Sequence, residues 1–522
     1  MALKKLDVTS DVLGGKGDAA IIVTEDESNK DGISFSRDSL RKATVKLARE
    51  LMGNGVAKGD VVSFALANTV EYVMLFFATA KAGAVCAPLN PAYKSAEFEF
   101  YLQDVAAKLL LLPPQGSPEG EKAAKTLNVP CFAITMDEAC EVHLDVLAGG
   151  QAPAVPSVLQ LPKVDSESVA LFLHTSGTTS KPKGVPLLHR NLMTTVKNII
   201  GTYELSPQDR SYLVMPLFHV HGLMAGLLSA LGSGGSVVLP KAGKFGAQVF
   251  WKDVKEQKAT WYTAVPTMHQ ILLARAVDNK DHEGVELRFI RSCSASLAAP
   301  VLDQLEKTFK APVLEAYAMT EAAHQMTSNP LPKHGSRKPG SVGKGTNVEI
   351  AILSAEGKQL GVGEVGEVCI KGQNVTPGYH NRPEANTEAF AHGWFHTGDQ
   401  GKLDEEGYLT LTGRLKELIN RGGEKISPLE VDSALLSCEA VAEAVAFAAP
   451  HEKYGEEVNA AVVLKPGAKT SEAEILAVAK GLLGDFKIPK QLFITDVLPK
   501  TATGKIQRRF VAEHFLKPKS KL

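Results

Sequence analysis

The chain has 522 residues, of which 44% are hydrophobic and 22% are charged. These fractions are typical of a globular protein, so the composition excludes a disordered chain, a collagen-like repeat and a coiled coil. Lys and Arg (57) nearly balance Asp and Glu (58), which gives a formal net charge of −1. Because nucleic-acid-binding proteins usually carry a basic excess, no nucleic-acid partner is expected.

Strand-like apolar runs alternate with helical stretches along most of the chain. We expect strands over residues 61–66, 108–112, 169–173 and 287–290, and a helix over residues 69–82. This alternation predicts an α/β fold, with layered, mostly parallel sheets flanked by helices. Residues 211–240 carry no Asp, Glu, Lys or Arg, but Pro, His and Gly interrupt them. They therefore predict a buried helix followed by a strand at 236–239, and no membrane span is expected.

The C-terminal part has a different pattern, which predicts a small, mobile α+β domain. Strands are expected over residues 444–448 and 459–464, and a helix over 471–483. Ser471 and Glu474 have the spacing of a capping box at the start of that helix. We predict an N-terminal domain over residues 1–415 and a C-terminal domain over residues 416–522.

A loop rich in hydroxyls, glycines and lysines directly follows the expected strand at 169–173. Its candidate phosphate-binding residues are Thr175, Ser176, Gly177, Thr178, Thr179 and Lys183. Small residues let backbone N–H groups approach an anion, hydroxyls donate to it, and lysines neutralise its charge. The loop is not a Walker loop, because Lys183 precedes Gly184. A flexible surface linker is the alternative, but a position directly after a buried strand favours a polyphosphate site.

This loop and four later motifs resemble, in order, the signatures of the acyl-adenylate-forming enzymes. That family contains acyl-CoA synthetases, peptide-synthetase adenylation domains and beetle luciferase. The later motifs are residues 317–321, 393–399, 413–419 and 499–505. The resemblance implies that ATP activates a carboxylate as an acyl-adenylate, that Mg²⁺ assists, and that CoA then accepts the acyl group. It also implies a C-terminal domain that rotates between the two steps.

Residue roles follow from the same resemblance. The implied nucleotide-binding residues beyond the loop are Ala316, Tyr317, Thr320, Asp399, Arg414 and Lys505. The implied catalytic residues are Lys505, Glu321 and Thr320, and the implied Mg²⁺ ligands are Glu321 and Thr178. The implied hinge is Lys416. The residues implied to contact CoA are Gly422, Gly423 and Lys425. Each motif also has a plainer interpretation. Tyr317 can be a core residue, Glu321 a helix-start carboxylate, Asp399 a turn residue and Gly422-Gly423 an ordinary β-turn.

The acyl substrate is indicated by three polar residues. His219, Ser294 and His324 lie in segments where the family lines its acyl pocket, and His324 follows Glu321 by three residues, one turn if that segment is helical. A pocket for a fatty or aromatic acid is expected to be apolar, whereas a second carboxylate needs such donors. One or more of these histidines packing elsewhere is the alternative.

A closer resemblance points to one substrate. Residues 174–185, 216–223, 261–267, 291–297 and 422–428 resemble the oxalate–CoA ligases of plants and fungi. The implied reaction converts oxalate to oxalyl-CoA with release of AMP and pyrophosphate, as in oxalate degradation. A 4-coumarate-type or medium-chain acyl-CoA ligase, a luciferase-like oxygenase and an RNA-binding protein remain alternatives.

The tripeptide Ser520-Lys521-Leu522 has the form of a peroxisomal address. It predicts recognition by the peroxisomal import receptor, with the cytosol as the second choice of compartment.

Overall fold

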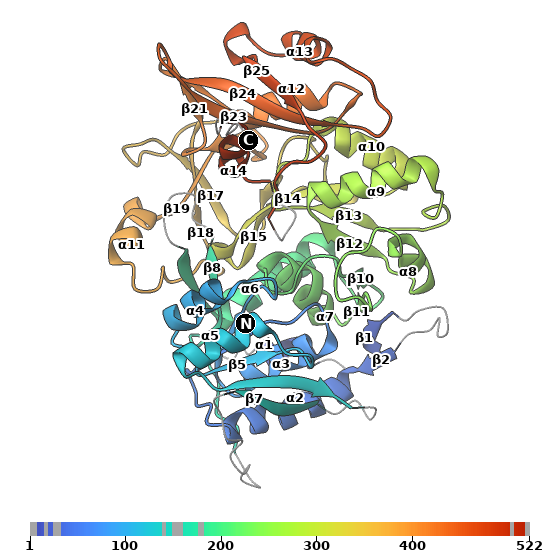
Figure 1. Cartoon of the computed structure of the whole chain (residues 1–522), viewed down its shortest axis with the longest axis vertical. Coiled ribbons are helices and arrows are strands. Elements are labelled where there is room, and N and C mark those ends of the chain that lie inside the picture. The colour runs from blue at the N-terminus through green and yellow to red at the C-terminus, as the bar shows by residue number, and fades with distance from the viewer. Residues whose placement is uncertain are drawn as a thin grey trace, which may run out of the picture. The chain divides into compact units, whose positions relative to one another are not determined.

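The computed structural model describes residues 8–14, 19–24, 33–137, 142–148, 160–175, 182–501 and 506–516 (Figure 1). Its contacts divide the chain into two units. The first comprises Met1–Thr263, Ala318–Met326 and Gly372–Thr387, and the second comprises Ala264–Tyr317, Thr327–Lys371 and Glu388–Leu522. Within the described ranges, no helix is both long and apolar enough to cross a membrane.

The first unit contains a seven-stranded sheet in the order β7-β6-β5-β3-β4-β8-β9. Its strands are β3 (Val61–Phe64), β4 (Val85–Pro88), β5 (Leu109–Leu112), β6 (Cys131–Met136), β7 (Val142–Ala148), β8 (Val169–Thr175) and β9 (Lys183–Leu188). The inner pairs are parallel, and the edge pairs β6–β7 and β8–β9 are antiparallel. All four leucines of β5 are buried, as expected for a strand covered on both faces. The α/β prediction is confirmed here.

Helices of the first unit pack around these strands. They are α1 (Val8–Leu13), α2 (Arg37–Gly53), α3 (Val70–Lys81), α4 (Ser95–Asp104), α5 (Pro118–Leu127) and α6 (His189–Tyr203). Helix α3 confirms the helix predicted over 69–82: the Thr69 side chain caps it by accepting from the Tyr72 N–H. Ten of its twelve residues are buried, which marks α3 as a core helix rather than a surface one.

The charge-free stretch folds as predicted, into a buried helix followed by a strand, with one unforeseen detail. The helix begins as a π-helix, η1 (His221–Leu228), continues as α7 (Ser229–Gly232), and leads to β11 (Ser236–Leu239). Gly222 is required near its start, because a Cβ there would lie 2.3 Å from the Pro216 carbonyl oxygen. The surrounding elements are β1 (Ala19–Val23), β2 (Ile33–Ser36), β10 (Arg210–Tyr212), α8 (Phe250–Glu256) and β12 (Trp261–Ala264). Strand β11 pairs in parallel with β1 and β10.

The second unit begins with α9 (Pro266–Asp278), β13 (Phe289–Ser292), α10 (Ala299–Phe309) and β14 (Val313–Met319). The strand predicted over 287–290 was placed two residues early. Arg288 is exposed, whereas Arg291 and Ser292 are buried, so the strand continues through polar residues that looked like loop. Strands β15 (His324–Ser328) and β16 (Lys344–Gly345) follow and pair at Thr327 and Ser328.

The second unit also contains a four-stranded antiparallel sheet, in the order β17-β18-β19-β20. Its strands are β17 (Glu349–Leu353), β18 (Gly366–Lys371), β19 (Phe395–Leu403) and β20 (Leu409–Arg414). The short helices in these parts of the chain are η2 (Thr320–Ala322), η3 (Pro332–His334), α11 (Pro383–Ala389) and η4 (Ala391–Gly393).

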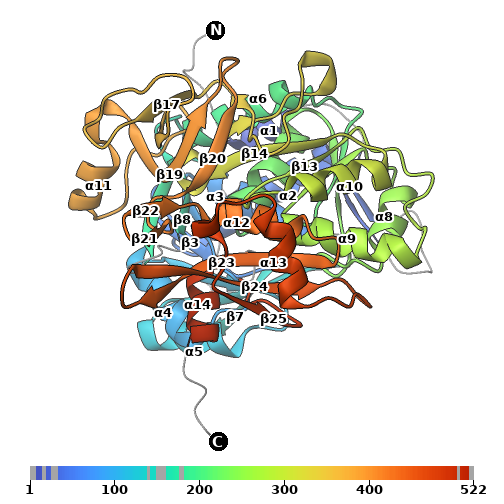
Figure 2. The same cartoon turned by 90° about the horizontal axis from the view of Figure 1, so that it is seen from above.

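The C-terminal residues form a five-stranded sheet with helices on both faces (Figure 2). Its elements are β21 (Ile419–Arg421), β22 (Glu424–Ile426), α12 (Pro428–Leu436), β23 (Val441–His451), β24 (Gly455–Leu464), α13 (Glu472–Lys480), η5 (Asp485–Lys487), β25 (Gln491–Ile494) and α14 (Arg508–Leu516). Side chains alternate along β23: Ala446 packs with α12 and α13, and Phe447 packs with α14. The predicted capping box of Ser471 and Glu474 is present. The predicted domain boundary at residue 416 falls in a turn after β20 and stays a prediction.

Candidate functional site

Only the two ends of the predicted phosphate loop belong to the described residues. Thr175 ends β8 and pairs with Lys183, the first residue of β9, in an antiparallel hairpin. The loop therefore leaves and re-enters the sheet at one edge, directly after a buried strand. Ser176, Gly177, Thr178 and Thr179 lie outside the described residues, as do Lys505 and the tripeptide at 520–522.

Glu321 is held from a second segment of the first unit. Its carboxylate Oε1 accepts a 2.8 Å hydrogen bond from the Tyr379 hydroxyl, and its backbone carbonyl accepts one of 2.7 Å from the Thr376 N–H. The Lys183 ammonium lies 4.0 Å from the centre of the Tyr379 ring. One tyrosine thus links the candidate metal ligand to the end of the phosphate loop. Glu321 is 7% exposed, and a carboxylate oxygen is the ligand type that Mg²⁺ prefers, so this residue fits the ion.

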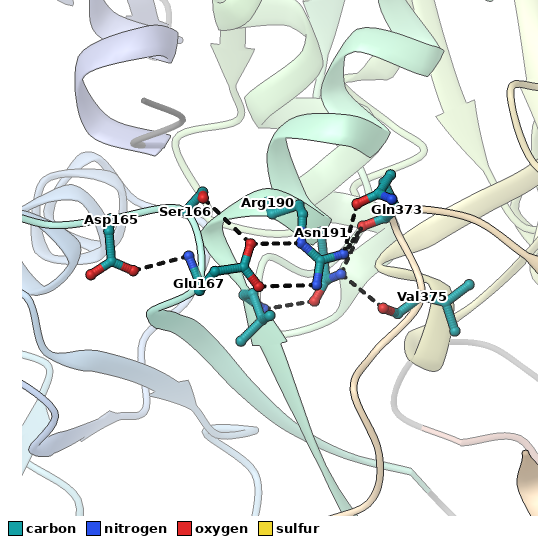
Figure 3. A network of polar contacts seen from close by, with 8 residues as sticks. Asp165, Ser166, Glu167, Arg190, Asn191, Gln373 and Val375 are labelled. Atoms are coloured by element: carbon teal, nitrogen blue, oxygen red, sulfur yellow. Dashed lines mark hydrogen bonds and ion pairs between the residues drawn. The ribbon is translucent and has the colours of Figure 1, made fainter. Parts of the chain in front are cut away.

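The segment that carries Tyr379 is tied to helix α6 (Figure 3). Asn191 Nδ2 donates to the carbonyl oxygens of Gln373 and Val375, each at 2.8 Å. Arg190 donates a 3.1 Å hydrogen bond to the Gln373 carbonyl oxygen, and its guanidinium donates two further hydrogen bonds to the Glu167 carboxylate. These backbone bonds fix the segment before it reaches Tyr379, so the hydroxyl meets Glu321 from a fixed direction.

A second polar network, in the other unit, joins three predicted nucleotide-binding residues. The Tyr317 hydroxyl donates to Asp399 Oδ2 at 2.5 Å, and Arg414 Nε donates to Oδ1 at 3.0 Å. Asp399 and Arg414 face each other across β19 and β20, which explains why motifs 15 residues apart meet. Burial, together with the Asp399 carboxylate, raises the pKa of the Tyr317 hydroxyl well above its ordinary value. The hydroxyl therefore remains a donor at any working pH.

Histidines gather at the start of the π-helix in the first unit. His221 Nε2 lies 2.6 Å from Thr263 Oγ1, and the His221 N–H donates to His219 Nδ1 at 3.2 Å. The His324 ring stacks on His221, with ring centres 5.1 Å apart and planes inclined by 25°. His221 and His324 are both fully buried. Two of the three predicted substrate residues thus contact His221: His219 accepts from its backbone N–H, and His324 stacks on its ring.

The third predicted substrate residue, Ser294, belongs to the other unit and is half-buried after β13. Its φ of +72° is unusual for a residue with a side chain. His324 also has a positive φ, +106°. The helical setting considered for His324 is wrong: Glu321 lies in the short helix η2, whereas His324 opens strand β15. Strained backbone of this kind clusters at ligand-binding sites, where surrounding structure holds it in place.

The remaining predicted residues have simple local settings. Lys416 is exposed in the turn between β20 and β21, and Gly422 and Gly423 form the turn of the β21–β22 hairpin, with φ of +62° and +101°. Lys425 is exposed on β22, which starts at Glu424. Ala316 is buried on β14, and Thr320 is half-buried at the start of η2.

Three residues of these networks were missed by the sequence reasoning. Tyr379 follows Pro377-Gly378, a turn signal that gives no hint of its contact with Glu321. His221 lies in the motif at residues 216–223, but its sequence position gives it no role of its own. Thr263 lies 42 residues from the histidine that it contacts. Only the fold brings these residues together.

Comparison with known proteins shows the family of the chain. Residues 12–380 match the model of the AMP-binding enzyme family, and residues 430–505 match that of the AMP-binding enzyme C-terminal domain. The oxalate–CoA ligase of Arabidopsis thaliana is 53% identical over 492 residues, which cover 94% of this chain and 95% of that protein. The oxalate–CoA ligase of Saccharomyces cerevisiae is 46% identical over 493 residues, covering 90% and 89%.

A solved structure of similar fold contains the nucleotide and the metal. The O-succinylbenzoate coenzyme A synthetase of Bacillus subtilis, in complex with ATP and a magnesium ion, superposes with a TM-score of 0.81 at 29% identity, over 97% of this chain and 99% of that one. The two family models match most of the chain, and the chain belongs to the AMP-binding enzyme family.

Proposed function

We propose that the protein is an ATP-dependent acid–thiol ligase that converts oxalate to oxalyl-CoA, with release of AMP and pyrophosphate. The observation that carries the choice of acid is the histidine cluster of His219, His221 and His324. Two similar proteins that cover about nine-tenths of the chain are named oxalate–CoA ligases, which supports the same choice.

The histidine cluster suits a small dicarboxylate better than an apolar acid. Burying polar side chains against a hydrocarbon tail costs free energy, since their hydrogen bonds to water are lost without replacement. A carboxylate that remains charged after the first carboxylate has reacted gains from imidazole N–H donors, because charge-assisted hydrogen bonds are about twice as strong as neutral ones. A π-helical start at His221 is also typical of functional sites. Ser294 is proposed as a further donor to oxalate.

In the first half-reaction, one oxalate oxygen attacks the α-phosphorus of ATP and pyrophosphate leaves. The chain's task is to hold the reactants in line and to neutralise phosphate charge. We assign the loop of Thr175 to Lys183 to the phosphates, with Lys505 between the attacking carboxylate and the α-phosphate. Asp399 is assigned to the ribose, and Tyr317 offers its ring face to the adenine. Glu321, with Thr178, would hold Mg²⁺, which supplies charge neutralisation on the phosphate oxygens.

In the second half-reaction, the CoA thiol attacks the acyl carbonyl and AMP leaves with the electrons of the broken C–O bond. We assign Gly422, Gly423 and Lys425 to the path of CoA and Lys416 to the hinge on which the C-terminal residues turn. The left-handed backbone of the Gly422-Gly423 turn favours glycine and leaves no side chain to block a narrow thiol path.

The test is an ATP–pyrophosphate exchange assay with a panel of acids at fixed Mg²⁺ and salt. Oxalate should drive exchange, and 4-coumarate and octanoate should not; the reverse ranking would contradict the choice of acid. His324→Leu should lower kcat/KM for oxalate by roughly 10- to 100-fold, the loss of one or two charge-assisted hydrogen bonds. His189→Leu is the matched control. That histidine is also fully buried in the first unit but accepts from the Val8 N–H, so its loss should lower stability and leave substrate preference unchanged.

The peroxisome is the proposed compartment, on the basis of Ser520-Lys521-Leu522. A chain that carries a fluorescent protein at its N-terminus should localise to peroxisomes. The same fusion without the last three residues should remain in the cytosol. Diffuse fluorescence with the tripeptide intact would contradict the proposal.

A further inference from the structure

A group of sulfur, nitrogen and oxygen ligand atoms lies in the antiparallel sheet of the second unit. It consists of Glu367 and Cys369 on β18 and His396 on β19. Among the described residues, this is the group of three His, Cys, Asp or Glu side chains whose ligand atoms all lie within 4.8 Å of one another. Nothing in the assigned reaction uses these three side chains as ligands.

Strand geometry explains why the three residues meet. Glu367 and Cys369 are two positions apart on one strand, so their side chains point to the same face of the sheet. Cys369 and His396 are directly opposite each other in the register of β18 and β19. The register of β18 against β19 shifts between Glu367 and Cys369, but β18 pairs with β17 without a shift over these residues. The group is therefore built on paired strands, which hold metal ligands more accurately than loops do.

The distances fit a tetrahedral cation of the zinc class. Bond lengths of about 2.3 Å to sulfur and about 2.05 Å to nitrogen, at a tetrahedral angle, place the two ligand atoms about 3.6 Å apart. Cys369 Sγ and His396 Nδ1 are 3.5 Å apart. His396 Nδ1 and Glu367 Oε2 are 2.8 Å apart, so this pair has to open by about 0.5 Å to reach a tetrahedral separation.

Surrounding hydrogen bonds orient the ligands as they do around known metal sites. His396 Nε2 lies 3.1 Å from the Ala391 carbonyl oxygen, to which it can only donate. Nδ1, the atom that faces Cys369 and Glu367, donates to Glu367 Oε2 at 2.8 Å, and a cation bound there would take the place of that proton. The other carboxylate oxygen, Glu367 Oε1, accepts a 2.9 Å bond from the Gly398 N–H. A ligating histidine usually donates its second N–H to a carbonyl in this way, and a ligating carboxylate is usually hydrogen-bonded in turn.

The burial of the group allows a cation to enter. Cys369 is fully buried, whereas the side chains of His396 and Glu367 are 15% and 21% exposed. A cation can thus approach from the side of the histidine and the carboxylate and reach the sulfur last. Three protein ligands would leave the fourth tetrahedral position to water, the arrangement of an open zinc site.

We infer that Glu367, Cys369 and His396 bind a thiophilic divalent cation of the zinc class, distinct from the Mg²⁺ assigned to Glu321. Binding releases the thiol proton of Cys369 and the Nδ1 proton of His396 to solvent as the bonds to the metal form, so the charge balance needs no oxidant or reductant. The site is coupled to the nucleotide network, because Glu367 holds the N–H of Gly398 and the next residue is Asp399.

The experiment uses the full untagged chain, treated with a chelator and then titrated with Co²⁺ and with Zn²⁺. Wild-type protein should take up about one equivalent of Co²⁺ and develop the absorption of thiolate-to-cobalt charge transfer, which Zn²⁺ should then displace. Cys369→Ser should abolish that absorption and weaken Zn²⁺ binding by roughly 100-fold or more. Cys438→Ser is the matched control, since Cys438 is also a buried free cysteine of the second unit but belongs to no such group of ligand atoms among the described residues. Its titration should be unchanged.

A second variant covers the case in which Cys369→Ser misfolds. Glu367→Gln keeps an oxygen for the Gly398 N–H and removes only the negative charge, so the sheet should fold while Zn²⁺ affinity falls by roughly 10- to 100-fold. Wild-type protein that binds no cobalt after chelation, or a charge-transfer band that survives Cys369→Ser, would overturn the inference. Neither result depends on oxalate being the substrate, so the two proposals fail separately.

Discussion

Removing the hydroxyl of Tyr317 tests whether the network around Asp399 serves the nucleotide. Tyr317→Phe keeps the aromatic face assigned to adenine and deletes the 2.5 Å bond to Asp399 Oδ2. Arg414 still holds Oδ1 at 3.0 Å, and the Asp399 N–H still donates to Thr397 Oγ1 at 3.1 Å. The carboxylate should therefore stay in place but lose one of the contacts that fix its rotation.

The expected magnitude follows from the kind of bond. A hydrogen bond to a charged group contributes about 1.5–3 kcal/mol, and 1.4 kcal/mol corresponds to a factor of ten in affinity. Because Arg414 retains half of the network, we expect the lower end of this range, about a tenfold rise in KM for ATP. Since the Tyr317 hydroxyl is a donor at any working pH, the effect should not vary with pH between 6 and 9.

The assay is ATP–pyrophosphate exchange at saturating oxalate, with ATP varied, alongside thermal unfolding of each protein. Tyr408→Phe is the matched control, because its buried hydroxyl also donates to an oxygen, the Ser336 carbonyl at 2.6 Å, within the same unit. Both variants should lose about 1–2 kcal/mol of stability, but only Tyr317→Phe should raise KM for ATP. An unchanged KM for Tyr317→Phe, or an equal rise for both variants, would refute the role given to the network.

Two further predictions concern pH and the proposed CoA path. Burial raises the pKa of Glu315 to about 8, so between pH 4.5 and 8 the folded chain keeps a proton that the unfolded chain releases. The contribution of this group to the free energy of unfolding is complete below pH 4.5 and is lost as pH rises through 8, by on the order of a few kcal/mol. Glu315→Gln should flatten this decline, measured by thermal unfolding at several pH values. An unchanged slope of stability against pH would contradict the assignment. Gly423→Val, at a φ of +101° with open space around a Cβ, should slow transfer to CoA about tenfold and leave pyrophosphate exchange intact. Gly467→Val, at +76° and equally open, should change neither rate, and equal losses for both valines would remove the CoA assignment.

Local signals in the sequence were enough to predict several elements. The apolar stretch at 69–82 predicted helix α3. Ser471 with Glu474 predicted the start of α13, because capping depends on residues one turn apart. The short apolar run at 108–112 predicted the strand β5, because such a run is itself a local signal. The strand β13 was misplaced because Arg291 is fully buried, and what satisfies a buried arginine is set by tertiary contacts rather than by its sequence neighbours.

The site was predicted as a set of motifs, and its internal connections were not. The motifs gave Tyr317, Asp399 and Arg414 separate roles, because each has its own sequence signal. Their mutual bonds depend on the register of β19 against β20, which a one-residue slip would change and which no single motif encodes. The contact of Tyr379 with Glu321 is likewise a property of the fold, since 58 residues separate the two.

The motif at residues 317–321 is divided between the two units, and this affects how its variants should be interpreted. Tyr317 belongs to the second unit and bonds Asp399, whereas Glu321 belongs to the first and bonds Tyr379. Neighbours only four positions apart thus bond different residues: Tyr317 bonds Asp399, and Glu321 bonds Tyr379. Mutations more than about 7–10 Å apart that share no partner usually have additive effects. Tyr317→Phe and Tyr379→Phe should therefore add in free energy, and a non-additive pair would mean that the motif acts as one unit despite its two sets of contacts.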